Sequence, residues 1–223
     1  MDGRRDIQWS DTIRLKLEEK ASKLQNYLDM AIAITENTNS PPKGLEDFIF
    51  AAGNAIEIAR EEQFAFAQDL NNPVHLRAAA ELLTTSRAGR WVDISPGLAC
   101  INAAIRQTKE RKTKQACLVF RAHMKRCGMG TARLHLRVNA QQVLTAIGAH
   151  VPITGDDRLN SRTFLRRVSK FTDKVKPIKS DFAMLDAQDS TVNRQLLLAA
   201  QILKFIDRDM PIRFLIAECD QAS

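Results

Sequence analysis

Apolar residues in the first part of the chain recur at the spacing of one helix face. Successive apolar positions are four or three residues apart, at Leu17, Ala21, Leu24, Leu28 and Ala31. These steps predict an amphipathic helix, and Ser10 is the expected N-cap. The proline-containing polar segment 37–44 then predicts a loop.

The same periodicity predicts three further helices before the middle of the chain. One is expected over about 45–70, with inward-facing residues at Phe48, Ala52, Ile56, Ala59 and Phe66. Asn72 and Pro73 indicate the cap and first position of a short helix that runs to about Ser86. Ser95 followed by Pro96 opens a helix that we expect to reach Cys127, with a bend or a solvent-exposed stretch at 106–115, where no apolar stripe exists.

The second half offers weaker but similar signals. Asn139, Ser161 and Ser190 are potential N-caps of helices over about 140–148, 161–172 and 191–209. The apolar segment 211–218 fits either a helix or a strand. Other strand signals are too few for a sheet, and 9 Gly and 7 Pro argue against a turn-rich all-β fold. We therefore predict an all-α protein, a compact bundle of six to eight helices that are possibly grouped in two helical subdomains.

Charge divides the chain more sharply than hydropathy does. Residues 1–95 carry 11 basic and 15 acidic side chains, residues 96–179 carry 18 and 4, and residues 180–223 carry 4 and 7. The net charges are −4, +14 and −3. A basic centre between acidic ends is typical of a surface that binds a polyanion. We expect an acidic helical packing and assembly region at 1–95 and a basic helical region at 96–223.

The first basic run lies within the predicted helix that ends at Cys127. On a helical wheel, Arg121 and Lys125 lie within about 20° of Lys114, and Arg111 lies about 60° away. The predicted core side consists of Ala116, Val119, Phe120, His123 and Cys127. A rigid helix should therefore hold this ridge of bases at one face.

A second basic run repeats this arrangement. Its ridge steps by four through Arg158, Arg162, Arg166 and Lys170, with Arg167 beside it. The predicted core side consists of Phe164, Leu165, Val168, Phe171 and Val175. Arg133 and Arg137 lie between the two runs and complete the predicted nucleic-acid-binding set. The planar guanidinium suits phosphate oxygens, although a basic run can also be an ordinary solvated face.

The aromatic residues of the basic region limit how it could read a nucleic acid. Phe120, Phe164 and Phe171 all lie on predicted core faces, so base stacking is not expected. We expect weakly sequence-specific contact with the phosphate backbone, which suits packaging or coating better than operator recognition.

Other chemistry finds little support. Cys117, His123 and Cys127 lack the spacing of a zinc site, and the sequence around Gly128 and Gly130 lacks a phosphate-loop motif. No motif of a hydrolase or metalloprotease occurs, and Asp156–Asp157 beside Arg158 needs no catalytic explanation. We predict a non-enzyme without cofactor or metal.

The expected location is intracellular, either cytoplasmic or nuclear, with a virion as an alternative. No apolar run approaches the length of a membrane span, and the N-terminus resembles no signal peptide. The four cysteines are then expected as reduced thiols.

The sequence thus predicts a helical, self-associating nucleic-acid-binding protein, with RNA favoured over DNA. A nucleocapsid, coat or matrix protein of a virus would fit this distribution of charge. The seam of the first helix is too short for a coiled coil and serves either the core or a homo-oligomer contact. Two alternatives remain: a dimeric helix-turn-helix DNA-binding regulator built on 139–171, and a peripheral matrix protein on an anionic membrane.

Overall fold

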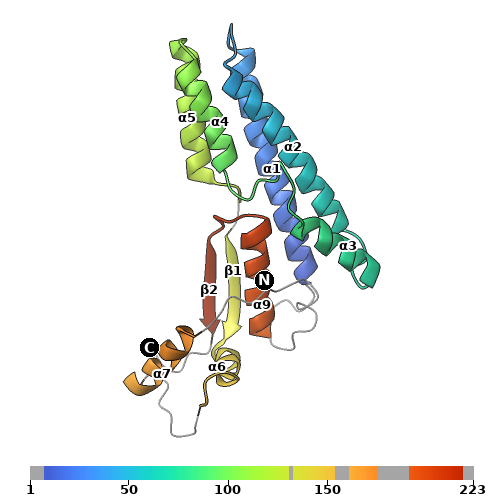
Figure 1. The fold of residues 1–223 in the computed structure, drawn as a ribbon, viewed down its shortest axis with the longest axis vertical. Helices are drawn as coiled ribbons and strands as arrows, with labels where there is room; N and C mark the ends of the chain where they lie inside the picture. Colours follow the sequence, from blue (N-terminus) through green and yellow to red (C-terminus); the bar gives the residue numbers. More distant parts are fainter. Residues whose placement is uncertain (1–7, 131–132, 154–160, 175–190, 218–223) are drawn as a thin grey trace. The chain divides into compact units, whose positions relative to one another are not determined.

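The computed structural model describes residues 8–130, 133–153, 161–174 and 191–217, and it is predominantly helical (Figure 1). The eight helices in these ranges are α1 (Trp9–Glu36), α2 (Lys43–Ala65), α3 (Pro73–Thr84), α4 (Ser95–Gln107), α5 (Arg111–Cys127), α6 (Ala140–Gly148), α7 (Arg162–Thr172) and α9 (Thr191–Phe205). Two strands, β1 (Leu134–Asn139) and β2 (Ile212–Ala217), form a small sheet. The expected fold of six to eight helices is confirmed.

The chain divides into two compact units, which we describe separately. Unit 1 contains residues 135–199 and the described residues from 212 onward. Unit 2 contains the described residues up to 134 together with residues 200–211. The chain therefore leaves unit 2 after β1 begins, builds unit 1, and returns to unit 2 for one short segment.

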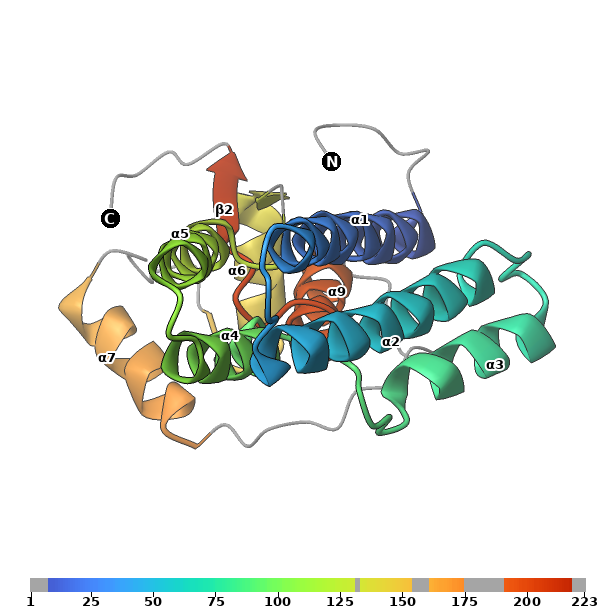
Figure 2. The ribbon, with the colours of Figure 1, turned by 90° about the horizontal axis from the view of Figure 1, so that it is seen from above.

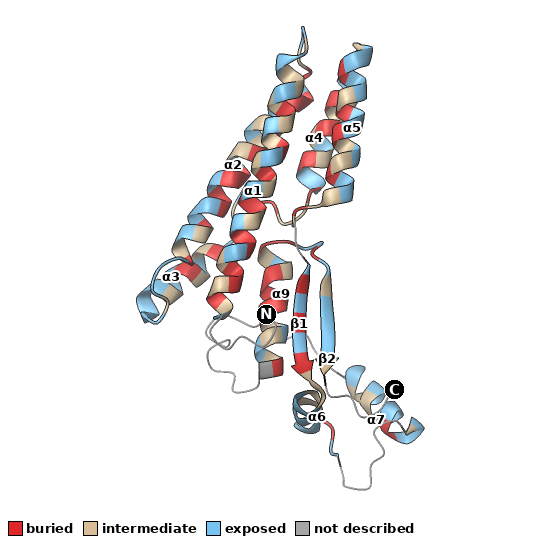
Figure 3. Cartoon of the chain, turned by 180° about the vertical axis from the view of Figure 1, so that it is seen from behind, coloured by how far each residue is buried: buried red, intermediate tan, exposed pale blue. Residues whose placement is uncertain are grey.

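Unit 2 is built around four helices that form the corners of a square (Figure 2). Helices α1 and α4 each pack against both α2 and α5, so α2 and α5 occupy diagonally opposite corners. The enclosed core is rich in aromatic rings, with Phe48 lying 5.7 Å from Trp91 and 5.2 Å from Phe120 between ring centroids. Buried positions form stripes along the helices of this square (Figure 3).

The predicted inner face of α1 is largely correct, whereas its predicted start is wrong. Leu17, Ala21 and Leu24 are buried, as helical spacing requires. Gln8 is the N-cap in place of Ser10, and the Gln8 backbone N–H donates to Asp11 Oδ2 at 3.2 Å. Ser10 lies inside the helix and is buried, so the predicted cap was two residues too late.

The helix expected to run from Ser95 to Cys127 is two helices. Helix α4 ends at Gln107, and α5 begins at Arg111 with Glu110 as its N-cap. The Glu110 carboxylate accepts a hydrogen bond from the Thr113 hydroxyl at 2.9 Å. The break falls where the apolar stripe is missing, because no buried face there holds a continuous helix against the core.

The buried face of α5 is rotated from the predicted one. Phe120 is buried as expected, but Thr113, Cys117 and Met124 complete the stripe. Val119 was expected in the core and is 61% exposed. The prediction failed because it placed the core directly opposite the bases, whereas the bases of the ridge lie beside the core.

Unit 1 contains the sheet that the sequence did not predict. Leu134, Leu136 and Val138 are buried in β1 while His135 and Arg137 are exposed, which is the alternation of a half-buried strand. Segment 211–218, left open between helix and strand, forms β2 over most of its length and pairs with β1.

The predicted caps of unit 1 are correct where the structure describes them. Asn139 Oδ1 accepts from the Gln141 backbone N–H at 2.7 Å, and Ser161 Oγ accepts from that of Phe164 at 3.1 Å. Leu165 of α7, expected on the core side, is 52% exposed, and Phe164 is buried. The predicted cap Ser190 and the predicted core residue Val175 lie outside the described residues.

None of the helices within the described ranges combines the length and apolar character that crossing a lipid bilayer requires.

Candidate nucleic-acid interface

Helix α5 presents an exposed basic surface in unit 2. Its exposed bases are Arg111, Lys112, Lys114, Lys125 and Arg126. None of them forms an ion pair with any acidic residue that the structure describes. We call this set the α5 basic face. It lies on a helix whose opposite side is fixed in the aromatic core, so the charges are held in place.

Two bases of the α5 basic face were absent from the predicted site. Lys112 and Arg126 lie about 160° and 120° from Lys114 on the helical wheel, away from the predicted ridge. Their exposure follows from the true position of the buried stripe. A better assignment of the core face would have found them.

Arg121, a predicted contact residue, is turned toward the neighbouring helix. It is partly buried, and its Nη1 donates to Asn102 Oδ1 of α4 at 3.1 Å. Arg121 therefore belongs to the same ridge, but part of its hydrogen-bonding capacity is already used within the bundle.

Arg133 and Arg137 are both exposed around the start of β1. Arg133 belongs to unit 2, whereas Arg137 belongs to unit 1.

Helix α7 presents a second basic surface, in unit 1. Arg162, Arg166 and Lys170 are exposed and step by one helical turn, and none has an ion pair with a described residue. We call this set the α7 ridge. Arg167 is half-buried, and its guanidinium carbon lies 5.4 Å from the centre of the Phe164 ring. Arg158 lies outside the described residues.

Exposed aliphatic side chains interrupt both basic surfaces. In α5, Leu118 is 39% and Val119 is 61% exposed, and in α7 Leu165 is 52% exposed. Phe120 and Phe164 are buried, as expected, so neither ring is available for base stacking. The two surfaces therefore combine bases with aliphatic groups.

A pocket of about 280 Å³ opens between α6, α7 and α9 within unit 1. Its walls include Ile147, Val168 and Leu196, and the His150 ring stacks on Phe171 at 5.6 Å. None of the bases of the α7 ridge lines it. This apolar pocket and the basic ridge are thus separate features of α7.

Helices α6 and α7 do not form a compact helix-turn-helix. Residues 149–161 lie between the end of α6 and the start of α7. A DNA-reading pair is joined by a turn of about three or four residues.

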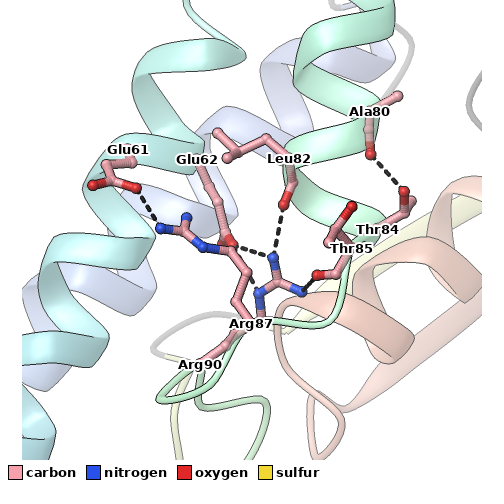
Figure 4. A network of polar contacts seen from close by, with 8 residues as sticks. All are labelled: Glu61, Glu62, Ala80, Leu82, Thr84, Thr85, Arg87 and Arg90. Carbon is pink, nitrogen blue, oxygen red and sulfur yellow. Dashed lines mark hydrogen bonds and ion pairs between the residues drawn. The ribbon is translucent and has the colours of Figure 1, made fainter.

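A buried ion-pair cluster lies in unit 2, away from the basic face (Figure 4). Glu62 is fully buried, and its Oε1 lies 2.6 Å from Arg90 Nη2. The same guanidinium donates to the carbonyl oxygens of Leu82 and Thr85, each at 2.8 Å. Because its donors bind groups of α2, α3 and the following loop, Arg90 has a structural role and holds these three parts together.

Lys20 and Asp207 extend this cluster toward α1 and the returning segment. Both side chains are buried, and no hydrogen-bond partner of Lys20 Nζ occurs among the described residues. Burial lowers the pKa of Lys20 from 10.5 to about 8, although Glu62 counteracts part of this shift. Burial raises the pKa of Glu62 and of Asp207. No sequence signal distinguished these residues from ordinary surface charges.

Three cysteines of α4 and α5 are free thiols, and the histidine of α5 packs within the bundle. Cys100, Cys117 and Cys127 form no disulfide, and burial raises the pKa of Cys117. Cys127 Sγ lies 3.8 Å from His123 Nδ1, and the His123 ring packs edge-on against Tyr27 at 5.9 Å. Within the described ranges, no group of three His, Cys, Asp or Glu side chains could hold a metal ion.

Comparison of the chain with protein-family models, with curated proteins and with solved structures found no match.

Proposed function

We propose that this protein is a self-associating, structural nucleic-acid-binding protein of the nucleocapsid, coat or matrix type. It binds the phosphate backbone, RNA in preference to DNA, and catalyses no reaction. The observation that carries the proposal is that the α5 basic face and the α7 ridge hold exposed bases without ion pairs to described residues.

Basic side chains on a rigid helix that have no ion pair within the described ranges favour a polyanionic partner for an energetic reason. An exposed ion pair within the protein contributes little, whereas binding several phosphates releases their condensed counterions into solution. Both helices have a buried side, so little backbone order has to be gained on binding.

The preference for RNA depends on how duplex DNA is usually read. A helix pair joined by a short turn inserts one helix into the major groove, and α6 and α7 lack such a turn. The described part of the basic region also offers no exposed phenylalanine, tyrosine or tryptophan ring on which nucleobases could stack. Contact limited to the backbone suits coating of a strand regardless of its sequence.

An anionic membrane surface is a second candidate partner. Leu118, Val119 and Leu165 are exposed among bases, and helices that lie in a lipid interface combine aliphatic and basic side chains in this way. This alternative predicts binding to phosphatidylserine vesicles and little affinity for RNA.

The test is a salt titration of binding to labelled single-stranded RNA, random duplex DNA and phosphatidylserine vesicles. We expect binding to RNA without sequence preference, with log affinity falling linearly with log salt. The triple variant Arg162→Gln, Arg166→Gln, Lys170→Gln should reduce that slope by about 2, since each contact to a single strand contributes about 0.7.

The control variant, Lys43→Gln with Arg77→Gln, removes two exposed basic side chains from α2 and α3. It should leave the slope unchanged. Equal losses in the control and the α7 variant would remove the site assignment, and absence of RNA binding at low salt would overturn the proposed function.

A further inference from the structure

Helix α2 exposes an acidic surface that contains aromatic side chains, on the opposite side of the unit 2 bundle from the α5 basic face. Phe50 is 78% exposed and Phe64 is 70% exposed. Both rings lie on the same side of the helix, since their separation of 14 positions amounts to nearly four full turns. Because both rings lie on the outer side of α2, this side is a candidate surface for contact with a partner.

Acidic side chains flank Phe50 on this side of α2. Glu46, Asp47 and Glu57 are exposed, and none forms an ion pair with a described residue. Glu61, one turn beyond Glu57, pairs with Arg87 at 2.6 Å. We define the α2 acidic face as Glu46, Asp47, Phe50, Glu57 and Phe64.

The α5 basic face is complementary to the α2 acidic face in charge and in arrangement. In α5, the aliphatic pair Leu118 and Val119 lies between Lys112 and Lys125, which are about 20 Å apart along the helix. In α2, Phe50 lies between Glu46 and Glu57, which are about 17 Å apart. Each surface thus places exposed apolar side chains between charged ones, and the charges of the two surfaces have opposite signs; Phe64 extends the α2 acidic face beyond Glu57.

We propose that the α2 acidic face of one copy docks on the α5 basic face of a second copy. Docking removes Phe50 and Val119 from water and places carboxylates beside ammonium and guanidinium groups that lack a partner among described residues. The inference rests on the self-association that is part of the proposed function and names its surfaces.

The position of the two faces determines the kind of assembly. Because α2 and α5 occupy diagonal corners, their outer faces point to opposite sides of the bundle (Figure 2). A contact between unlike faces is heterologous, and each added copy leaves one face of each kind available. Such a contact builds a chain of copies that closes only if the rotation between them happens to complete a ring.

The α5 basic face then has two competing partners, nucleic acid and the α2 acidic face of a neighbouring copy. Nucleic acid bound at α5 displaces the α2 acidic face of the neighbouring copy, while the α7 ridge remains available to nucleic acid. Short RNA added in excess should therefore shorten assemblies that form through α5.

Two variants test the contact by sedimentation velocity at low salt without nucleic acid. The α2 variant carries Glu46→Gln, Phe50→Ser and Glu57→Gln, and the α5 variant carries Lys112→Gln, Val119→Ser and Lys125→Gln. We expect wild type to form species larger than dimers, each variant alone to be monomeric, and their equimolar mixture to form a 1:1 dimer. The dimer forms because each variant retains the face that the other has lost.

The control variant Leu15→Ser, Glu18→Gln, Asp29→Asn removes one exposed apolar and two acidic side chains from α1 and should associate like wild type. A monomeric wild type, a mixture that stays monomeric, or a single variant that still associates would overturn the inference. RNA binding by the α2 variant is measured in parallel and should be tighter than that of wild type at low salt, because no neighbouring α2 acidic face competes for its α5 basic face. Loss of RNA binding in wild type, with the association pattern intact, would remove only the proposed nucleic-acid function.

Discussion

The guanidinium of Arg90 connects three separate parts of the chain. It contacts Glu62 of α2, the Leu82 carbonyl of α3 and the Thr85 carbonyl of the following loop (Figure 4). A fork with several donors suits this geometry, and a lysine could not reproduce it. Nothing in the sequence separated Arg90 from the many surface arginines, because its role depends on partners that the fold brings together.

Replacing Arg90 should therefore be much more costly than replacing Arg87, a nearby arginine that is less buried. Arg90→Met leaves the Glu62 carboxylate buried without its ion-pair partner, which should lower the free energy of unfolding by about 3–5 kcal/mol. Arg87→Met breaks the more exposed pair with Glu61 and should cost less than about 1 kcal/mol. Urea unfolding of both variants measures the difference, and equal losses would contradict this role of Arg90.

Lys20 makes the stability of unit 2 depend on pH. Its pKa in the folded protein is about 8, against 10.5 for an ordinary lysine. Below pH 8 the lysine is charged in both states, and the folded state bears the whole cost of burying the charge. Between pH 8 and 10.5 the folded state loses the proton first, so stability should rise with pH.

Lys20→Met should be more stable than wild type at pH 7, by about 1–3 kcal/mol, because Glu62 keeps its contacts with Arg90. This difference in stability should decrease between pH 8 and 10.5, because Lys20 of the folded wild type loses its proton in this range. Urea unfolding at pH 7 and pH 10 compares the two proteins. A variant that is less stable at pH 7 would show that Lys20 stabilises Glu62 and Asp207 more than its own burial costs.

At the scale of elements, the closest approach of α2 to α4 depends on a glycine. A Cβ at Gly44 would overlap the backbone nitrogen of Ala104 and lie 2.6 Å from the carbonyl oxygen of Cys100. The backbone N–H of Gly44 also donates to Gln107 Oε1 at 2.8 Å. A side chain there requires the two helices to move apart.

Gly44→Ala should destabilise the protein by about 1–3 kcal/mol, as overpacking of a buried contact does. Gly53→Ala is the matched control in the same helix, because nothing lies within 4 Å of its added Cβ. That change should stabilise by about 0.5–1 kcal/mol through higher helix propensity. Thermal unfolding distinguishes the opposite signs, and a stable Gly44→Ala would contradict the close helix contact.

The elements that the sequence predicted well are those specified by local chemistry. Asn72, Asn139 and Ser161 all cap helices with side-chain hydrogen bonds, as their positions indicated. Strand β1 was missed, although Leu134, Leu136 and Val138 alternate with polar residues. One short alternating run does not predict a strand unless a second segment is known to pair with it. That partner, β2, comes more than 70 residues later in the chain.

At the scale of the whole molecule, the sequence predicted the charge distribution but not which surfaces carry it. The basic centre of the chain supplies bases to two units, with α5 in one and α7 in the other. The predicted core face of α5 was rotated by part of a turn from the observed one. Val119 was therefore placed in the core, and Lys112 and Arg126 were left out of the predicted binding site. The helical wheel fixes which residues share a face, whereas tertiary packing decides which face is buried.

The return of residues 200–211 to unit 2 has a consequence for the order of events during synthesis. The ribosome makes α1, α2, α4 and α5 first, then all of residues 135–199, and only afterwards Asp207 and the Arg208 backbone N–H that donates to the Val92 carbonyl. While the middle of the chain emerges, the nascent bundle exposes the surface that this segment will cover, including the surroundings of Lys16 and Lys20. Folding of the earliest helices is thus completed by nearly the last part of the described chain, and this interval is when a chaperone would find a binding site on them.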